Sequence, residues 1–274
     1  MNKFVKNYLR NDKLPHMWCP GCGHGIIMHQ IIKAIDKLGL DKNNICVVSG
    51  IGCSSRAPGY MDFDTLHTTH GRALPFATGI KLANPDMKVI VVSGDGDASA
   101  IGGNHLIHAC RRNIDITTIV FNNTIYGMTG GQYSPTTAIN DLGSTAPYGN
   151  IDRPFDIAKL AAAAGASYSA RSTVYHANNL EKLIREALQV KGFSLVEAMS
   201  MCPTSYGKRN KKGTVSNMLE DYKNTYIDIK AFNKLPEDKR KDKIEMGVFK
   251  NETNPEYTEE YQKIIDGLKG DKDE

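Results

Sequence analysis

The chain contains 274 residues, of which 41% are hydrophobic and 23% charged, a composition typical of a globular protein that buries one sizeable core. Its formal net charge of +4 is small for this length and argues against a dedicated nucleic-acid-binding protein, which usually carries a strong basic stripe. Residues 1–18 contain no apolar core of a signal peptide, and no stretch is apolar over the length of a membrane span. We therefore expect a cytoplasmic protein that binds neither nucleic acid nor membrane.

Helices and strands are predicted to alternate along most of the chain. The predicted helices cover residues 23–38, 73–83, 99–111, 155–164 and 178–190. The predicted strands cover residues 44–50, 88–94, 115–122, 167–170 and 193–199. Such an alternation predicts an α/β fold whose parallel sheet is covered by helices on both faces.

The character of the sequence changes after residue 205. The runs at 208–212 and 236–243 are strongly charged and lack apolar periodicity. We expect residues 1–205 to form the main domain and residues 206–274 to form a charged C-terminal extension that packs on itself or on a partner subunit. This is favoured over a phosphate-binding patch, because charged runs are usually solvated surface.

Thiols and polar side chains follow four of the predicted strands. Cys53 follows the first strand and Asp95 the second, while Asn122 and Asn123 end the third and Cys202 follows the last. The carboxyl ends of parallel strands form the ligand-binding edge of such sheets. If these strands are neighbours, all five residues converge on one crevice.

The turn "SGDGDAS", which leaves the second strand, has the character of a phosphate-binding loop. Its glycines allow backbone N–H groups to approach a phosphate at the start of a helix. It lacks the third glycine of a dinucleotide-binding motif and the Gly-Lys pair of a P-loop, so alone it is equally well explained as a plain turn. Asn123, which lies 28 residues after Asp95, makes a cofactor site the stronger interpretation, because carboxylate and carboxamide oxygens suit Mg²⁺ bound to phosphate.

"GDG" followed by "NN" at this interval resembles the motif of thiamine-diphosphate enzymes. The resemblance implies that the side chains of Asp95 and Asn123 bind Mg²⁺, together with the backbone carbonyl of Ile125. It also implies that the cofactor contacts the residues around both turns, namely Gly94, Gly96, Asp97, Met128 and Thr129.

Six cysteines in a cytoplasmic protein are unlikely to form structural disulfides. The "CPGC" motif with Cys19 and Cys22 is compatible with a redox dithiol, half of a zinc site or half of an iron–sulfur site. A dithiol leaves Cys53 and Cys202 without a role, whereas all four make a complete Cys₄ set. Zinc sites are commoner, but a redox-inert ion has little to do beside a thiamine cofactor, so this position favours a [4Fe–4S] cluster. Cys46 and Cys110 are predicted to be core residues.

The assembly resembles the β subunit of 2-oxoacid:ferredoxin oxidoreductases over residues 15–210. The resemblance depends on "WCPGCGHG", "SGIGCSSR", "HTTHGRALPFATGIKLANP", "VVSGDGD", "GGNHLIHACRRNID", "NNTIYGMTGGQYSPTT" and the isolated Cys202. "GCS" with Arg56, followed by "HTTHGRA", is most similar to the 2-oxoglutarate type. One departure is Ser55, where close relatives are expected to have glycine.

This resemblance implies coenzyme A-dependent oxidative decarboxylation of a 2-oxoacid, here 2-oxoglutarate to succinyl-CoA and CO₂, with electrons passing through the cluster to ferredoxin. It implies an α subunit that carries the pyrimidine-binding half of the site. Arg56 is expected to pair with a substrate carboxylate, with a structural ion pair as the alternative. His70 is expected to orient the cofactor or the keto acid.

Three alternatives remain open at this point. The preferred substrate could be pyruvate, or the enzyme could accept several 2-oxoacids. A thiamine-dependent decarboxylase without a redox step is disfavoured by the four convergent cysteines. A non-catalytic iron–sulfur or zinc scaffold subunit is disfavoured by the presence of both Asp95 and Asn123.

Overall fold

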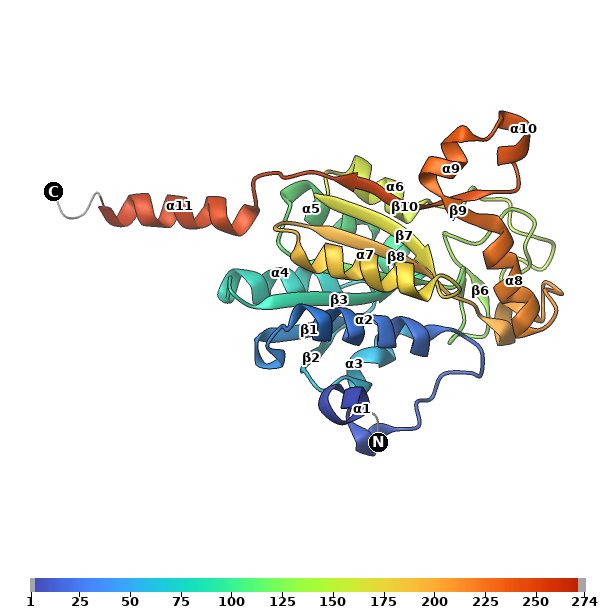
Figure 1. The fold of residues 1–274 in the computed structure, drawn as a ribbon, viewed down its shortest axis with the longest axis horizontal. Coiled ribbons are helices and arrows are strands. Elements are labelled where there is room, and N and C mark those ends of the chain that lie inside the picture. Colours follow the sequence, from blue (N-terminus) through green and yellow to red (C-terminus); the bar gives the residue numbers. More distant parts are fainter. Residues whose placement is uncertain (1–2, 271–274) are drawn as a thin grey trace.

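The computed structural model describes residues 3–270, which build an eight-stranded sheet covered by helices (Figure 1). The strands lie in the order β2-β1-β3-β4-β8-β7-β10-β9. Neighbouring strands are parallel throughout, except that β10 runs antiparallel to β7. The strands are β1 Ile45–Ser49, β2 Asp64–His67, β3 Lys88–Gly94, β4 Thr117–Asn122, β7 Tyr168–Thr173, β8 Ser194–Met199, β9 Tyr226–Asp228 and β10 Ile244–Asn251.

The inner strands are apolar because both of their faces are covered. Every residue of β1, β4, β7 and β8 is buried, as are the five inner residues of β3. Such continuous burial is typical of parallel sheets, in which crossover helices lie on both sides. A separate antiparallel pair, β5 (Ile125–Tyr126) and β6 (Gln132–Tyr133), stiffens the loop that follows β4.

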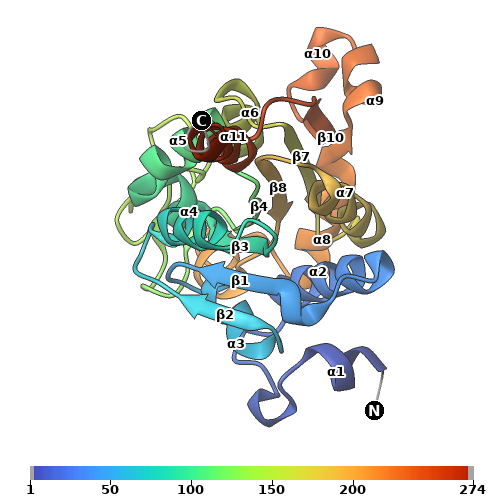
Figure 2. The same ribbon diagram turned by 90° about the vertical axis from the view of Figure 1, so that its left-hand side faces the viewer.

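Helices cover both faces of the sheet (Figure 2). On one face, α2 (His24–Leu38) packs beside α7 (Ala177–Gln189), and their apolar stripes share one core cluster with β1, β4 and β8. On the other face, α4 (Ala73–Ala83), α5 (Gly103–Arg112) and α6 (Ile157–Ala163) enclose a second cluster. The predicted fold class, a mostly parallel α/β sheet with helices on both faces, is confirmed.

Two predictions of local structure were wrong. The predicted helix 99–111 does not begin as an α-helix, because Asp97–Ile101 form a π-helical turn before α5 starts at Gly103. This wide turn brings the backbone close to Gly102, where a Cβ atom would lie 2.3 Å from the Asp97 carbonyl oxygen. Strand β2 was missed, because its four residues, Asp-Thr-Leu-His, include a single apolar side chain and are partly exposed at the sheet edge.

The segment after residue 205 contributes to the sheet as well as to the surface. Strand β10 pairs with β7, with Val248 opposite Ala170, and β9 adds a final parallel strand beyond it. Tyr226 and Met246 are buried, which the charged composition did not predict. The boundary at residue 205 remains a prediction.

The remaining helices are short or peripheral. The helix α11 extends away from the sheet (Figures 1 and 2). Between residues 3 and 270, no helix is both long enough and apolar enough to cross a membrane. The short and peripheral helices are α1 Lys3–Tyr8, α3 Ala57–Tyr60, α8 Val215–Thr225, α9 Ile229–Lys234, α10 Glu237–Arg240 and α11 Tyr257–Gly270.

Candidate functional site

The carboxyl ends of four adjacent strands meet at one edge of the sheet, as the sequence predicts. Strand pairing keeps these ends level, since Ser49 lies opposite Val92, and Gly94 lies opposite Phe121. The order β1-β3-β4-β8 therefore carries the loops that contain Cys53, Asp95, Asn123 and Cys202 to neighbouring positions. A polar crevice results from topology rather than from sequence proximity.

A cavity of about 180 Å³ opens at this edge. Its wall combines the turn after β3, the turn after β4 and the loop after β1. Arg56 does not line it. The predicted site residues in the wall are His70, Gly94, Asp95, Gly96, Asp97, Asn123, Ile125, Met128 and Thr129, and Cys53 lies among them.

Asp95 is a buried carboxylate with hydroxyl partners. Only 3% of the residue is exposed, and one oxygen, Oδ2, accepts hydrogen bonds from Ser134 Oγ at 2.6 Å and Thr136 Oγ1 at 2.7 Å. Burial raises the pKa of Asp95 to about 6, although these hydroxyls favour the charged form. No cationic side chain within residues 3–270 pairs with Asp95. A buried carboxylate in such a setting is stabilised by a bound cation.

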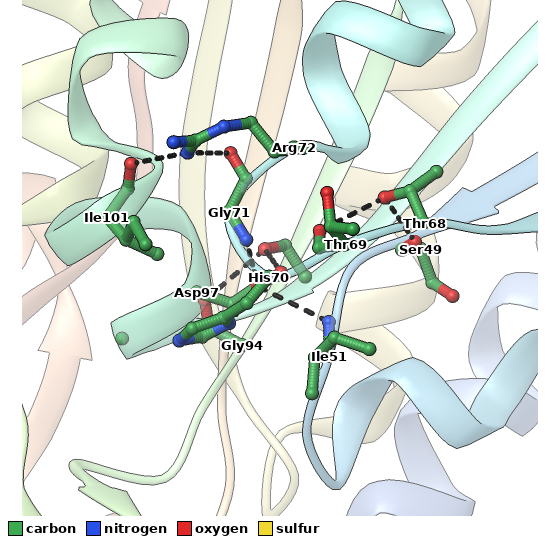
Figure 3. A network of polar contacts seen from close by, with 12 residues as sticks. Ser49, Ile51, Thr68, Thr69, His70, Gly71, Arg72, Gly94, Asp97 and Ile101 are labelled. Atoms are coloured by element: carbon green, nitrogen blue, oxygen red, sulfur yellow. Dashed lines mark hydrogen bonds and ion pairs between the residues drawn. The ribbon is translucent and has the colours of Figure 1, made fainter.

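Asp97 is also buried, but four protein donors surround its carboxylate (Figure 3). Oδ1 accepts from the Gly71 backbone N–H at 2.7 Å and the Ile51 backbone N–H at 3.3 Å, and it lies 2.6 Å from His70 Nδ1. Oδ2 accepts from Ser93 Oγ at 2.6 Å. Asp97 therefore ties the loops after β1, β2 and β3 together and fixes the His70 ring at the cavity wall.

Two glycines are required by close approaches around these carboxylates. A Cβ atom on Gly50 would lie 2.2 Å from Asp97 Oδ2, and one on Gly96 would lie 2.2 Å from the ring of Tyr126. The Tyr126 hydroxyl donates to the Gly96 carbonyl oxygen at 3.1 Å. Each close approach keeps a loop in contact with the turn that carries Asp95.

The turn after β4 is fixed by a buried polar chain. Asn122 Oδ1 accepts from the Thr124 backbone N–H, and Asn122 Nδ2 donates to Glu197 Oε1 at 2.8 Å. Glu197 Oε2 in turn accepts from Arg171 Nε at 2.7 Å, and both residues are buried. This series of hydrogen bonds fixes the backbone next to Asn123. The side-chain Oδ1 of Asn123 accepts from the Ile125 backbone N–H at 3.4 Å.

The four predicted ligand thiols lie in one neighbourhood. Burial, together with the nearby thiols of Cys19, Cys53 and Cys202, raises the pKa of Cys22 to about 11. A Cβ atom on Gly127 would lie 3.3 Å from Cys202 Sγ and 3.9 Å from Cys53 Sγ, so these two thiols approach the same residue. The segment between α1 and α2, which carries Cys19 and Cys22, therefore meets the loops that follow β1 and β8.

Backbone N–H groups are directed at these sulfur atoms. The Ser205 N–H donates to Cys202 Sγ at 3.4 Å, and the N–H groups of His24 and Met128 face the thiols of Cys22 and Cys53, respectively.

Within residues 3–270, no group of three or more His, Cys, Asp or Glu side chains is close enough to hold a single metal ion.

Three other side chains have the following positions. Arg56 is exposed, forms no ion pair with any residue between 3 and 270, and lies near enough to Cys53 to lower the pKa of that thiol against the effect of burial. Within residues 3–270, Arg56 therefore has no carboxylate partner, and its role in pairing with a substrate carboxylate stays a prediction. Cys46 and Cys110 are buried in the second core cluster, which confirms their prediction as core residues.

Several residues that shape the site were not assigned from the sequence. Ser134 and Thr136 hold Asp95, Tyr126 packs on Gly96, and Glu197 holds Asn122. The first three lie within the quoted motif "NNTIYGMTGGQYSPTT", which was the available signal. Their partners could not be identified without the path of the loop.

Comparison with known proteins agrees with this geometry. Residues 50–198 match the family described as "Thiamine pyrophosphate enzyme, C-terminal TPP binding domain". The fold and the site thus define the cofactor-binding domain of a thiamine-diphosphate enzyme.

Similar proteins narrow the class. The 2-oxoglutarate synthase subunit KorB of Methanothermobacter thermautotrophicus is 50% identical over 96% of this chain and 92% of its own length. KorB of Methanocaldococcus jannaschii is 49% identical over 96% of this chain and 98% of its own length. A solved 2-oxoglutarate:ferredoxin oxidoreductase from Magnetococcus marinus, with 2-oxoglutarate, coenzyme A and succinyl-CoA bound, has a TM-score of 0.85 and 33% identity, covering 96% of this chain and 90% of that chain. The chain belongs to the β subunits of 2-oxoacid:ferredoxin oxidoreductases.

Substitution of Asp97, the carboxylate at the centre of the network in Figure 3, tests its structural role. Asp97→Ala should lower the free energy of unfolding by about 3 kcal/mol or more, because several buried donors lose their acceptor and each costs about 1–3 kcal/mol. Urea unfolding measures the change. Asp97→Asn, which keeps one acceptor oxygen, should lose less. Asp86→Ala is the matched control, because Asp86 is exposed, and equal stabilities of Asp97→Ala and Asp86→Ala would contradict this role.

Proposed function

We propose that this chain is the catalytic β subunit of a cytoplasmic enzyme that converts 2-oxoglutarate and coenzyme A to succinyl-CoA and CO₂ and passes the electrons to ferredoxin. The observation that carries the proposal is that Cys53, one of four neighbouring thiols, lines the same cavity as Asp95 and Asn123. A thiol set and a hard-oxygen site therefore share one wall. This arrangement suits a reaction that couples decarboxylation to electron transfer.

The residues after β3 and β4 fit thiamine diphosphate and Mg²⁺. Asp95 is buried without a cationic partner among residues 3–270, and its carboxylate, the Asn123 amide and the Ile125 carbonyl are oxygen ligands that suit Mg²⁺. Gly94 and Gly96 line the cavity at the start of the π-helical turn, where backbone N–H groups suit a diphosphate. When bound, thiamine diphosphate supplies a nucleophilic carbon and an electron sink.

The thiols of Cys19, Cys22, Cys53 and Cys202 fit a [4Fe–4S] cluster. Four cysteines from three segments approach one another, and three backbone N–H groups face their sulfur atoms. Such N–H groups stabilise negative charge on sulfur and tune the potential of a cluster. When bound, the cluster supplies one-electron chemistry next to the thiamine site.

The chain's own side chains bind and orient the reactants. His70 lines the cavity, and its hydrogen bond with Asp97 holds the ring in one orientation. Arg56 lies close to Cys53 and has no ion-pair partner in the described part of the chain, which suits it to recognise the distal carboxylate of a dicarboxylic 2-oxoacid. Met128 and Thr129 are exposed at the mouth and available to contact substrate.

The complete enzyme requires other components. The relatives carry subunit names, and the enzyme from Magnetococcus marinus binds 2-oxoglutarate, coenzyme A and succinyl-CoA. We infer that this chain works with an α subunit that supplies the pyrimidine-binding half of the site. Ferredoxin, or a ferredoxin-like subunit, then accepts the electrons.

Metal analysis tests the cluster. Anaerobically purified αβ complex should contain about four iron atoms per β chain, as one such cluster requires. Cys53→Ala should lose the iron, while Cys46→Ala, the matched control for a core cysteine, should retain it. Stoichiometric zinc in the wild type would show that the Cys₄ set is structural.

Asp95→Ala should abolish Mg²⁺-dependent binding of thiamine diphosphate and leave the iron content unchanged, because oxygen and thiolate sites are chemically separate. Calorimetric titration of the αβ complex with the cofactor measures the binding. Cys53→Ala should still bind the cofactor. Unchanged cofactor affinity in Asp95→Ala would mean that the motif is misassigned.

Arg56→Ala should reduce kcat/KM for 2-oxoglutarate about tenfold to a hundredfold. A charge-assisted hydrogen bond is worth about 1.5–3 kcal/mol, and 1.4 kcal/mol corresponds to about one decade. Pyruvate, which lacks the second carboxylate, should be far less affected. Equal losses for the two acids would exclude Arg56 from substrate selection.

A further inference from the structure

The basic segment, residues 208–212 with the sequence Lys-Arg-Asn-Lys-Lys, adjoins the thiol set at both of its ends. At the first end, Pro203–Gly207 form a single π-helical turn directly after Cys202. At the other end, Val215 begins α8 and packs on Gly21, where a Cβ atom would lie 2.4 Å from Val215 Cγ2. Because Gly21 lies between Cys19 and Cys22, the segment connects the two thiol-bearing turns.

The cations of the basic segment are available for an external partner. Lys208, Arg209 and Lys211 are exposed, and their side chains form no ion pair or hydrogen bond within residues 3–270. Lys212 is different, since its Nζ lies 3.7 Å from Asp141 Oδ1. Three uncompensated positive charges therefore lie on one short stretch.

The basic segment is held in a fixed shape. Asn210 Oδ1 accepts from the Leu142 N–H at 2.7 Å, and Asn210 Nδ2 donates to the Leu142 carbonyl at 3.1 Å. The Lys212 N–H donates to the Gly207 carbonyl oxygen at 2.9 Å. The cations thus occupy a defined turn instead of a flexible tail.

We propose that the basic segment is the docking surface for an acidic electron-carrier protein, which receives electrons at the exposed side of the thiol set. This inference rests on the proposed function, since it needs the cluster. Cys19 is exposed, so solvent and a partner reach the thiols on this side. Electron transfer weakens steeply with distance, and complementary charge next to the donor shortens and orients the encounter.

The surface beside the basic segment suits a protein better than a phosphate group. The adjoining hollow is lined by Gly130, Thr204, Ser205, Lys208 and Arg209, and both cations in it are exposed. A tight phosphate site needs donors that converge on one anion, whereas exposed, spread charges steer a protein surface. The phosphates of coenzyme A are the competing ligand, because Gly130 follows Thr129 of the cofactor cavity.

The step is a one-electron exchange. A cluster held by Cys19, Cys22, Cys53 and Cys202 would be oxidised by one electron, and the iron–sulfur centre of the carrier would be reduced by one. No covalent bond forms or breaks, and no proton moves. Two encounters remove the electron pair of one turnover.

A charge-reversal experiment tests the proposal in the anaerobic αβ complex, with an acidic ferredoxin as the probe. Lys208→Glu/Arg209→Glu/Lys211→Glu should weaken ferredoxin binding, measured by biolayer interferometry, at least about tenfold at low salt. The KM for ferredoxin should rise in parallel. Turnover with methyl viologen, the KM for coenzyme A and the iron content should stay at wild-type values.

The matched control reverses three other exposed cations outside the basic segment, Lys234→Glu/Lys239→Glu/Lys241→Glu, and should bind ferredoxin as the wild type does. Wild-type binding should also weaken between about 0.01 and 0.15 M salt, as screening predicts, which keeps the test valid if the first variant does not fold. Equal binding by both triple variants, or salt-insensitive binding, would overturn the proposal. The proposal would also be overturned if the charge-reversal variant bound ferredoxin as the wild type does but showed a raised KM for coenzyme A or lost the α subunit. Absence of iron from the wild type would instead refute the proposed function.

Discussion

The parallel pairing of β1, β3, β4 and β8 is the constraint on which the site depends. It keeps the carboxyl ends of these strands level, so that residues distant in sequence reach one edge. A shift of one residue in the register would turn each strand's buried side chains to the opposite face. Burial on both faces of the sheet therefore fixes the position of Cys53, Asp95, Asn123 and Cys202 together.

Two carboxylates two residues apart then take different roles because their partners differ. Asp97 is satisfied by donors from the loops after β1 and β2 and from Ser93 of β3, and it acts as the structural centre of the crevice. Among the described residues, the donors to Asp95 are hydroxyl and backbone groups, and burial raises the pKa of Asp95 to about 6. The first arrangement stabilises the protein without a ligand, while the second suits a bound cation.

The sequence predicted the parts of the molecule that are governed by periodicity and topology. The apolar runs of β1, β3, β4 and β8 and the helical stripes of α2 and α7 were strong local signals, and the edge rule then brought the site loops together. Strand β10 was missed because its partly exposed sequence, Ile-Glu-Met-Gly-Val-Phe-Lys-Asn, acquires strand structure by pairing with β7.

Side-chain partnerships could not be predicted in the same way. The roles of Ser134 and Thr136 depend on how a loop of irregular structure folds back over Asp95, which no local pattern encodes. Similarly, the sequence placed Asp97 among cofactor contacts, and the structure adds its hydrogen bonds to His70, Gly71 and Ile51. The cofactor contacts themselves remain predictions.

The central claim is that one edge of the sheet holds a thiamine-diphosphate site and an iron–sulfur cluster side by side. The most direct measurement is an anaerobic crystal structure of the αβ complex with thiamine diphosphate and Mg²⁺, with anomalous data collected at the iron and zinc edges. The account predicts iron anomalous density enclosed by Cys19, Cys22, Cys53 and Cys202, and Mg²⁺ bound by Asp95, Asn123 and the carbonyl of Ile125. Zinc density between the four thiols, or a diphosphate bound away from Asp95, would contradict it.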